Sequence, residues 1–351
     1  SANLSVGGTS NFAGAVSLAS TLSVVGAATF SSKATFNDAV SVSGVLDVAG
    51  NTSVGGSFTA TGAAIFASTV TVVGNAVFTG DIQKKTAGTS NFAAGVNAGN
   101  SIESDGNYNV VVGDEAGTAI TTGDNNVAVG YAALDANTTG DNNVAVGRNS
   151  LGANTTAGNN TAVGASALDA NTTGTGNNAL GYNALSDNTT GNDNNAMGLY
   201  ALGDNTTGDY NTAVGHYALR VNTTADNNTA IGYAALDANT TGIQNNALGA
   251  SALTDNTTGN YNNAMGVSAL GDNTTGDNNT AVGHDALRLN TTGDLNVAVG
   301  HNALAANTTA MGNTAVGSSA LKSNTIGASN VALGLSALED NTEGNYNNAM
   351  G

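Results

Sequence analysis

The chain has 351 residues, with 48 Gly and no Pro, Cys or Trp, and its 7 basic and 25 acidic residues leave a formal net charge of -18. Only 9% of residues are charged, against about 25% in an ordinary globular protein, which argues against an average soluble enzyme. Without Cys there are no disulfides, thiolate metal sites or Cys nucleophiles in this sequence. The acidic balance disfavours nucleic acid and anionic membranes as partners, and no apolar run of about 18 residues predicts membrane insertion. Because the chain opens at Ser1 without Met, we expect a fragment or processed form.

Residues 1–83 carry a six-residue repeat. From Val6 to Phe78 every sixth residue is apolar, and Gly or Ser usually stands two places later. Apolar residues at i and i+2 are typical of a strand, and Gly allows a tight bend after it. We therefore expect a β shaft, built either as a triangular single-chain solenoid or as three chains wound round one axis.

A second repeat follows a stretch, 84–106, that fits neither period and that we expect to be a connector. From Gly113 to Gly351, Gly recurs every 17 residues without an insertion, and we assign residues 107–351 to this array. We number each unit from position 1, the residue after one Gly, to position 17, the next Gly; residues 131–147 (YAALDANTTGDNNVAVG) are a typical unit. One unit is too short to bury a core, so stacked units, and hence a β-solenoid, are expected.

Four positions of the 17-residue unit barely vary: Leu at position 4, Asn at 7, Asn at 13 and Ala at 15. We expect the Leu side chains to form the core and the Asn side chains to hydrogen-bond from unit to unit, as in the Asn ladders of cross-β stacks. The residues singled out as this structural ladder are Asn126, Asn143, Asn160, Asn228, Leu134 and Leu236.

The two faces of the predicted strand are both restricted. Positions 13 and 15 share one face, and position 16, on the other face, is always Val, Leu, Ile or Met. A lone solenoid would let one face vary, so we expect packing against other copies of the chain, as a homotrimer. Positions 1, 2, 5 and 11 vary, and we expect them to face solvent.

Several ligand hypotheses have simpler explanations. Asp-rich turns such as residues 123–126 offer oxygen ligands for Ca²⁺. Asp is missing from the corresponding position in half the units, however, and the preference of Asn, Asp and Gly for turns explains these residues without a metal ion. We therefore expect neither a metal nor another cofactor. Eleven Asn-Thr-Thr triplets match the N-glycosylation pattern, but an Asn-led turn whose Thr enters a strand accounts for them. Paired Thr columns could bind ice, but adjacent Thr residues point to opposite faces.

His residues give no convincing catalytic site. His216 and His284 stand four units apart, and Arg220 and Arg288 accompany them at the same spacing, which indicates duplication of a four-unit block. A pairing of His with Asp285 or Ser would lack a convergent partner in a periodic rod. We expect no catalytic residue and no enzymatic activity.

The repeats resemble those of fibre proteins. The hexad segments (LSVGGTSNF, TLSVVGAATF, AVSVSGVLDVAG, VTVVGNAVFTGDI) resemble shaft repeats of bacteriophage tail fibres. The NTAVG-x-x-AL-x-x-NTTG array is similar to repeats of tail-fibre-domain proteins, and NNVAVG and NTAIG are similar to head repeats of trimeric autotransporter adhesins, which form left-handed parallel β-rolls. The 17-residue period is longer than the usual adhesin unit, and the sequence shows no coiled-coil stalk or membrane anchor.

The resemblance implies an all-β, elongated trimeric fibre of β-solenoid or triple-stranded β-helix type. Its function would be structural and adhesive, as a tail-fibre shaft in a virion that presents a host-binding tip. Its partners would be itself, other tail or surface-fibre proteins, and host surface glycans. In the variable columns, the expected lateral contacts for glycans are Tyr131, Tyr200, Tyr217 and Tyr233.

Two alternatives remain open at this point. One is a bacterial or archaeal cell-surface adhesin or an extracellular matrix filament, located outside the cell or on its surface. The other is a monomeric solenoid that binds ice or carbohydrate.

Overall fold

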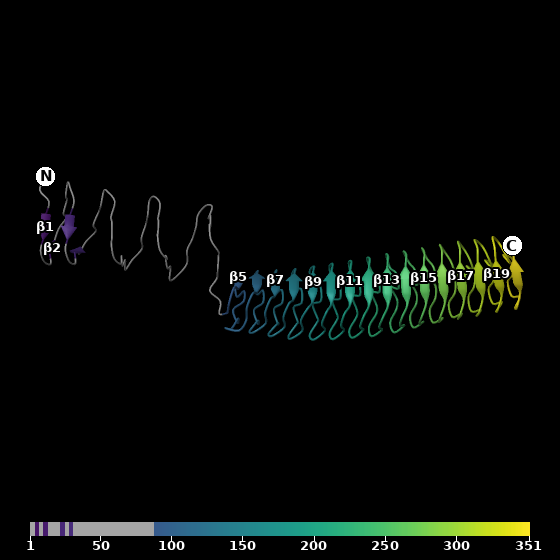
Figure 1. The fold of residues 1–351 in the computed structure, drawn as a ribbon, viewed down its shortest axis with the longest axis horizontal. Helices are drawn as coiled ribbons and strands as arrows, with labels where there is room; N and C mark the ends of the chain where they lie inside the picture. The colour runs from purple at the N-terminus through teal and green to yellow at the C-terminus, as the bar shows by residue number, and fades with distance from the viewer. Residues whose placement is uncertain (1–3, 7–9, 13–21, 25–27, 31–87) are drawn as a thin grey trace. The chain divides into compact units, whose positions relative to one another are not determined.

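The computed structural model describes residues 4–6, 10–12, 22–24, 28–30 and 88–351 (Figure 1). The chain divides into two units, residues 1–76 and 77–351, which are described separately. The described residues are all-β, with strands of three residues each. None of their segments is a helix long and apolar enough to cross a membrane.

The described strands of the first unit pair within the chain. β1 (Leu4–Val6) lies parallel to β3 (Leu22–Val24), and β2 (Ser10–Phe12) lies parallel to β4 (Ala28–Phe30). Paired residues such as Val6 and Val24 are 18 apart, which is three hexads. Over the described strands, this pairing within one chain agrees with the single-chain solenoid, one of the two alternatives for the hexad repeat. The remaining hexads lie outside the described residues.

The second unit is a β-solenoid with one parallel sheet of 16 strands, in which each strand pairs with the next one along the chain (Figure 1). The β-solenoid expected from the 17-residue period is therefore confirmed, with about 15 turns of about 17 residues. In chain order the strands are β5 (Phe92–Ala94), β6 (Val110–Val112), β7 (Val127–Val129), β8 (Val144–Val146), β9 (Thr161–Val163), β10 (Asn178–Leu180), β11 (Asn195–Met197), β12 (Thr212–Val214), β13 (Thr229–Ile231), β14 (Asn246–Leu248), β15 (Asn263–Met265), β16 (Thr280–Val282), β17 (Val297–Val299), β18 (Thr314–Val316), β19 (Val331–Leu333) and β20 (Asn348–Met350).

The first turn of this sheet lies in the stretch 84–106, where we expected a connector. β5 pairs with β6 in a register that joins residues 18 apart, instead of 17. Three residues stand between Ile102 and Gly106, whereas two stand between Ile120 and Gly123 in the next turn. One added residue at this corner hides the period in the sequence, but the described part of the stretch still forms a solenoid turn.

The core runs along the whole stack. Ala at positions 3 and 15, Leu at position 4, and Asn at positions 7 and 13 are buried in nearly every turn, and Leu134 and Leu236 have no exposed surface. Each fully buried Leu contributes roughly 1.5–3 kcal/mol of hydrophobic stabilisation. A single turn has too few such side chains to fold alone, so the turns stabilise one another by stacking.

Backbone geometry explains why position 17 hardly varies, whereas burial explains the constant Leu of position 4. At position 17, Gly232 has φ of +138°, and a Cβ there would lie 2.5 Å from the carbonyl oxygen of Gly249 in the next turn. Only Gly fits such a place. At position 4, Leu236 has φ of 55°, in the left-handed region that costs an ordinary residue about 1–2 kcal/mol. Its complete burial offsets this cost.

The first two turns fill the core with a different pair of residues at positions 4 and 7. Gly99 and Gly117 take the place of the position 4 Leu, with φ of +58° and +54°. A Cβ on Gly117 would lie 2.7 Å from Cδ1 of Ile120. The Ile side chain from position 7 therefore fills the core there, and the position 7 Asn ladder starts one turn later, at Asn137.

Candidate functional site

The Asn residues of position 13 form a continuous buried ladder. The backbone N–H of Asn228 donates to Oδ1 of Asn211 at 2.9 Å, and Oδ1 of Asn228 accepts from the backbone N–H of Asn245 at 2.9 Å. Nδ2 of Asn228 donates to the carbonyl of Gly242 at 2.8 Å. The other singled-out asparagines, Asn126, Asn143 and Asn160, make the same kinds of bond. These amides hold each turn to the next.

Position 7 forms a second buried ladder. Nδ2 of Asn239 donates to Oδ1 of Asn222 at 3.0 Å and to the carbonyl of Gly242 at 2.9 Å. All eleven asparagines of the Asn-Thr-Thr triplets have no exposed surface. The amide that N-glycosylation would modify is therefore inaccessible in the folded solenoid, where it donates hydrogen bonds to neighbouring groups.

The Thr residues after this Asn do not enter a strand, so that part of our interpretation is wrong. In the 17-residue turns of residues 107–351, the three-residue strand comes later in the unit, and the triplet forms a bend. The hydroxyl of Thr240 donates to the carbonyl of Thr257 in the next turn at 3.0 Å. The triplet is thus explained by contacts between turns.

Several residues at position 11 bind the preceding turn, although we expected this position only to face solvent. Oδ1 of Asp124 accepts the backbone N–H of Asn107 at 2.6 Å, and Oδ1 of Asp209 accepts that of Asn192 at 2.6 Å. These carboxylates bind the preceding turn, which accounts for the Asp-rich turns. No group of three or more His, Cys, Asp or Glu suited to a metal ion occurs in the part of the chain that the structure describes.

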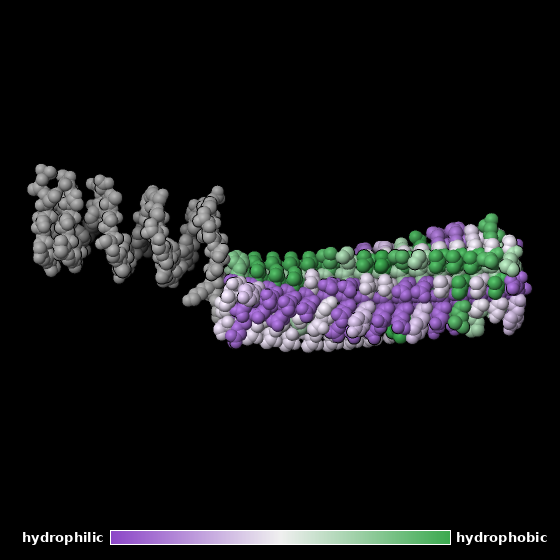
Figure 2. Space-filling model, in the orientation of Figure 1, coloured by the Kyte–Doolittle hydropathy of each residue, from purple (hydrophilic) through white to green (hydrophobic). Residues whose placement is uncertain are grey.

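The outer face of the sheet carries no charge, and one of its two side-chain columns, position 16, is apolar along its whole length. Positions 14 and 16 point outward, and from Val110 to Met350 they hold only Val, Thr, Asn, Leu, Ile and Met. Leu248 and Met265 keep 44% and 52% of their surface exposed in the isolated chain. Figure 2 shows the resulting hydrophobic band, which runs along the solenoid beside a hydrophilic one. We call positions 14 and 16 of all turns the outer sheet face.

Aromatic side chains gather at positions 1 and 2 of four successive turns. Tyr200 stacks on Tyr217 at 5.9 Å between ring centroids and meets the edge of Tyr182 at 5.6 Å. His216 stacks on Tyr217 at 4.1 Å and contacts Tyr233 at 5.8 Å. We call these five residues the aromatic cluster. Partial burial raises the pKa of Tyr200, and the neighbouring Tyr182 hydroxyl adds to the rise.

The cluster includes three of the four Tyr residues expected to be surface contacts. Tyr131 lies three turns before Tyr182, outside the cluster. The sequence reasoning missed Tyr182 and His216, although they stand in the same two columns of adjacent units. Comparing positions 1 and 2 across neighbouring units would have found them.

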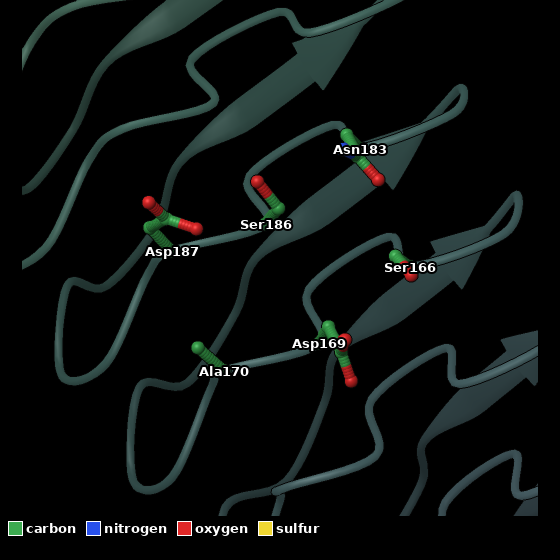
Figure 3. Close-up of a pocket in the computed structure, with 6 residues that line it drawn as sticks. All are labelled: Ser166, Asp169, Ala170, Asn183, Ser186 and Asp187. Carbon is green, nitrogen blue, oxygen red and sulfur yellow. The ribbon is translucent and has the colours of Figure 1, made fainter.

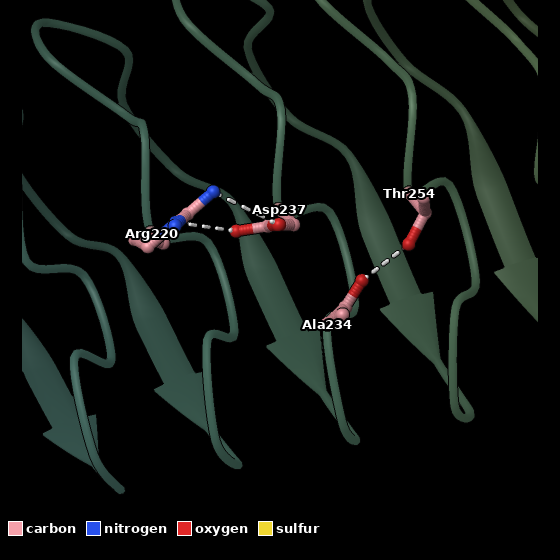
Figure 4. Close-up of polar contacts among 4 residues, drawn as sticks. All are labelled: Arg220, Ala234, Asp237 and Thr254. Carbon is pink, nitrogen blue, oxygen red and sulfur yellow. Dashed lines mark hydrogen bonds and ion pairs between the residues drawn. The ribbon is translucent and has the colours of Figure 1, made fainter.

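Arg220 connects the aromatic cluster to the carboxylates of position 5. Its guanidinium carbon lies 5.1 Å from the ring centre of Tyr217, and Nε and Nη2 donate to the two oxygens of Asp237 at 3.0 and 3.3 Å (Figure 4). The pKa of Asp237 is nevertheless raised. Burial is the main cause, the charges of Asp204 and Asp255 add to it, and together they outweigh the lowering by Arg220. The same figure shows the Thr254 hydroxyl donating to the carbonyl of Ala234 at 2.5 Å.

Arg288, which stands four turns after Arg220 at the same position, makes a different ion pair. Arg288 lies 3.7 Å from Asp285 in its own turn, since Ala305 takes the place in the next turn that Asp237 has after Arg220. Nδ1 of His284 lies 3.0 Å from Oδ2 of Asp285, and its ring stacks on His301 at 5.4 Å. This His–Asp pair joins adjacent residues on an exposed corner.

A shallow polar groove spans the first turn of the aromatic cluster and the turn before it. It has a volume of about 450 Å³ and is lined by positions 2, 5 and 6 of two successive turns (Figure 3). Its lining residues are Ser166, Asp169, Ala170, Asn183, Ser186 and Asp187. Burial raises the pKa of Asp169, the charge of Asp187 adds to the rise, and Arg148 opposes it. We call this the acidic groove.

No protein-family model matches the chain, and no curated protein is similar to it. The functional argument therefore depends on the three surfaces just described: the outer sheet face, the aromatic cluster and the acidic groove.

Proposed function

We propose that the chain is a structural fibre protein, a phage tail-fibre shaft in which three copies pack along their outer sheet faces. The observation that carries this is the uncharged outer sheet face, whose position 16 column is apolar in every turn from Val112 to Met350, in a chain of net charge -18. Large exposed apolar surfaces on soluble proteins mark interaction sites.

The outer sheet face has enough area for a stable interface. Fifteen strands spaced by ~4.8 Å give a length of about 70 Å, and two side-chain columns give a width of about 10 Å. Each copy would then bury roughly 700 Å², or ~1,400 Å² for a pair, which falls in the range of standard protein interfaces. A copy of the same chain offers a matching face of the same length and turn spacing.

Charge supports this partner and this arrangement. The acidic residues of the solenoid stand mainly at positions 5, 6 and 11, away from the outer sheet face. Association through that face brings no carboxylates into contact, while the acidic positions stay in water and oppose further lateral aggregation. The number three follows from the resemblance to trimeric fibres, as do the virion location and the partnership with other tail proteins.

Paired substitutions on the outer face test the proposal. Leu248→Asp with Met265→Asp places two charges in the interface of each copy, so the trimer is expected to dissociate while the circular dichroism of the solenoid is kept. Thr241→Asp with Thr258→Asp adds the same charges at exposed position 9 and serves as the matched control. The proposal fails if light scattering gives the same mass for wild type and the outer-face variant.

A further inference from the structure

We propose that exposed asparagines at position 14 fix the axial register between copies of the chain, so that the same turn of each copy lies at the same height. The proposal rests on the proposed function, because it concerns the outer sheet face through which the copies pack. It identifies the residues that select one alignment among the many that a periodic solenoid allows. They are Asn178, Asn195, Asn246, Asn263 and Asn348.

The repeated turns by themselves leave the alignment of two copies undetermined. From β6 to β20, consecutive strands pair residues that are 17 apart, so all these turns have the same length. A slip of one turn moves a copy by ~4.8 Å and leaves all but one turn packed. The apolar area buried at position 16 therefore hardly changes, and the hydrophobic effect is not directional. Residues that differ from turn to turn must specify the register.

Two surfaces that mark particular turns lie outside the outer sheet face. The aromatic cluster occupies positions 1 and 2, and the acidic groove occupies positions 2, 5 and 6. Within the interface, only positions 14 and 16 can distinguish one turn from another.

Asparagine at position 14 goes against local preference. Asn is depleted in β-strands, where Val and Thr are favoured, and position 14 is Val or Thr in the other ten turns from β6 to β20. Asn begins β10, β11, β14, β15 and β20, and its side chain is exposed in all five strands. A residue that breaks a local rule in the folded chain indicates a role beyond it.

Four of these asparagines are linked as two pairs. Nδ2 of Asn178 donates to Oδ1 of Asn195 at 3.0 Å, and Nδ2 of Asn246 donates to Oδ1 of Asn263 at 2.9 Å. Each bond uses one donor and one acceptor site, whereas every amide has two N–H donors and two acceptor lone pairs. Amides of other copies at the same height can bond to the remaining groups. An amide packed against an apolar side chain instead loses its water and gains no partner, which is unfavourable.

Only the alignment without slip sets all five asparagines level with asparagines. A slip of four turns is the nearest competitor, because it sets the first asparagine pair level with the second. The same slip leaves Asn263 level with Val331, so an amide meets an apolar side chain. A single buried Asn specifies the register of coiled coils in the same way.

Side-chain shape at position 16 varies in step with position 14. Each of the five turns with Asn carries Leu or Met at position 16. Nine of the other ten turns carry β-branched Val or Ile, and the tenth carries Leu333. The alignment without slip therefore also sets side chains of the same shape level with one another, and packed interfaces are sensitive to such differences in volume. Both columns favour the same register.

Single cysteines measure the register, because the chain has no Cys of its own. Val144→Cys, Thr212→Cys and Val297→Cys each place one thiol at position 14, and Val144 and Thr212 stand four turns apart. Variants with different affinity tags are co-expressed and treated with a bis-maleimide of about 10 Å span, which is shorter than the height of about 19 Å for four turns. The Val144→Cys chain is expected to crosslink with itself and with neither of the other variants.

Other alignments give other products. A four-turn slip joins the Val144→Cys chain to the Thr212→Cys chain. An antiparallel arrangement centred on the two asparagine pairs joins it to the Val297→Cys chain. Either product, alone or mixed with the self-crosslink, would overturn the proposal. Absence of every crosslink in a particle of several chains would also overturn it, since position 14 would then lie outside the interface.

Replacement of the paired asparagines tests their role. Thr occupies position 14 in neighbouring turns, so Thr in these four places is expected to keep the solenoid folded. Without the asparagines, the crosslink between the Val144→Cys and Thr212→Cys chains should rise at least about tenfold. The substitutions, made together, are Asn178→Thr, Asn195→Thr, Asn246→Thr and Asn263→Thr.

The matched control changes four threonines of the same column and keeps the asparagines. It should give the crosslinks of the unsubstituted face. An unchanged pattern in the asparagine variant, or an equal change in variant and control, would contradict the assignment. The control substitutions are Thr161→Val, Thr229→Val, Thr280→Val and Thr314→Val.

Light scattering on the same samples separates this proposal from the fibre assignment. A particle of several chains with slipped or mixed crosslinks would keep the assembly and contradict the register. A particle with the mass of one chain would contradict both.

Discussion

Truncation of Leu236 tests both the core and its unusual backbone. The side chain has no exposed surface, and Leu219 and Leu253 occupy the same place in the turns on either side. Leu236→Ala leaves a cavity between them, which the stacked backbone cannot close, and a cost of about 2–5 kcal/mol is expected. Because solenoid turns interact only with their neighbours, most of this cost should fall on the turns around the substitution.

Leu236→Gly gives the sharper comparison. In an ordinary helix or strand, Gly is worse than Ala because it loses another buried carbon and has more freedom when unfolded. At φ of 55°, however, Gly relieves about 1–2 kcal/mol of left-handed strain that Ala keeps. These effects nearly cancel, so the two variants are expected to differ by less than about 1 kcal/mol.

Native-state hydrogen exchange measures the effect where it occurs. A loss of 2–5 kcal/mol speeds exchange of the amides around Leu236 by roughly 30- to 5,000-fold. Exposed Thr241→Ala is the control and should leave exchange unchanged. The reasoning is refuted if Leu236→Ala leaves protection intact, or if the Gly variant exchanges more than about tenfold faster than the Ala variant.

Three further predictions concern polar groups. Asn228→Ala strands the backbone N–H of Asn245, whereas the carbonyl of Gly242 keeps its hydrogen bond from Asn239. At about 1–3 kcal/mol for one buried unpaired group, the free energy of unfolding in urea titrations should fall by roughly 1–3 kcal/mol. A loss below about 0.5 kcal/mol would contradict the ladder. Folded carboxyl groups with a raised pKa bind protons more tightly than the same groups in the unfolded chain. The free energy of unfolding should therefore fall as the pH rises from 3.8 through their folded pKa. A urea midpoint that is higher at pH 7 than at about pH 4 would contradict this direction. The carboxyls concerned are Asp169, Asp204, Asp237 and Asp255. Arg220→Ala removes a partly exposed ion pair and a ring contact, so the thermal midpoint should drop by the equivalent of about 1 kcal/mol. The drop should be smaller for Arg288→Ala, whose ion pair is longer. Equal drops in the two variants would contradict the difference between the two arginines.

The sequence predicts the stacking core because each position is sampled fifteen times in one chain. A position such as 13, where Asn never changes, must satisfy the same buried contacts in every turn, and the hydrogen bonds of Asn228 show which contacts these are. The apolar residues of position 16 likewise indicated a surface that is not free to vary, and the structure shows it half-exposed in the single chain.

Other features are hidden because several residue types satisfy the same need. Position 11 varies among Asp, Asn, Gly, Thr, Ile, Met and Ala, yet the carboxylates of Asp124 and Asp209 bind the preceding turn. The left-handed backbone at Leu236 could not be predicted, since Leu is an unfavourable residue for that conformation and its constancy indicates only burial. The aromatic cluster combines two positions from four turns, and neither column is aromatic throughout.

The most direct test of the fibre assignment is the mass and shape of the purified chain, by light scattering and single-particle electron microscopy. The proposed trimeric fibre predicts three chains per particle, in a rod whose 17-residue array alone is about 70 Å long at the strand spacing of a β-sheet. A particle with the mass of one chain, with the apolar band left in water, would contradict it.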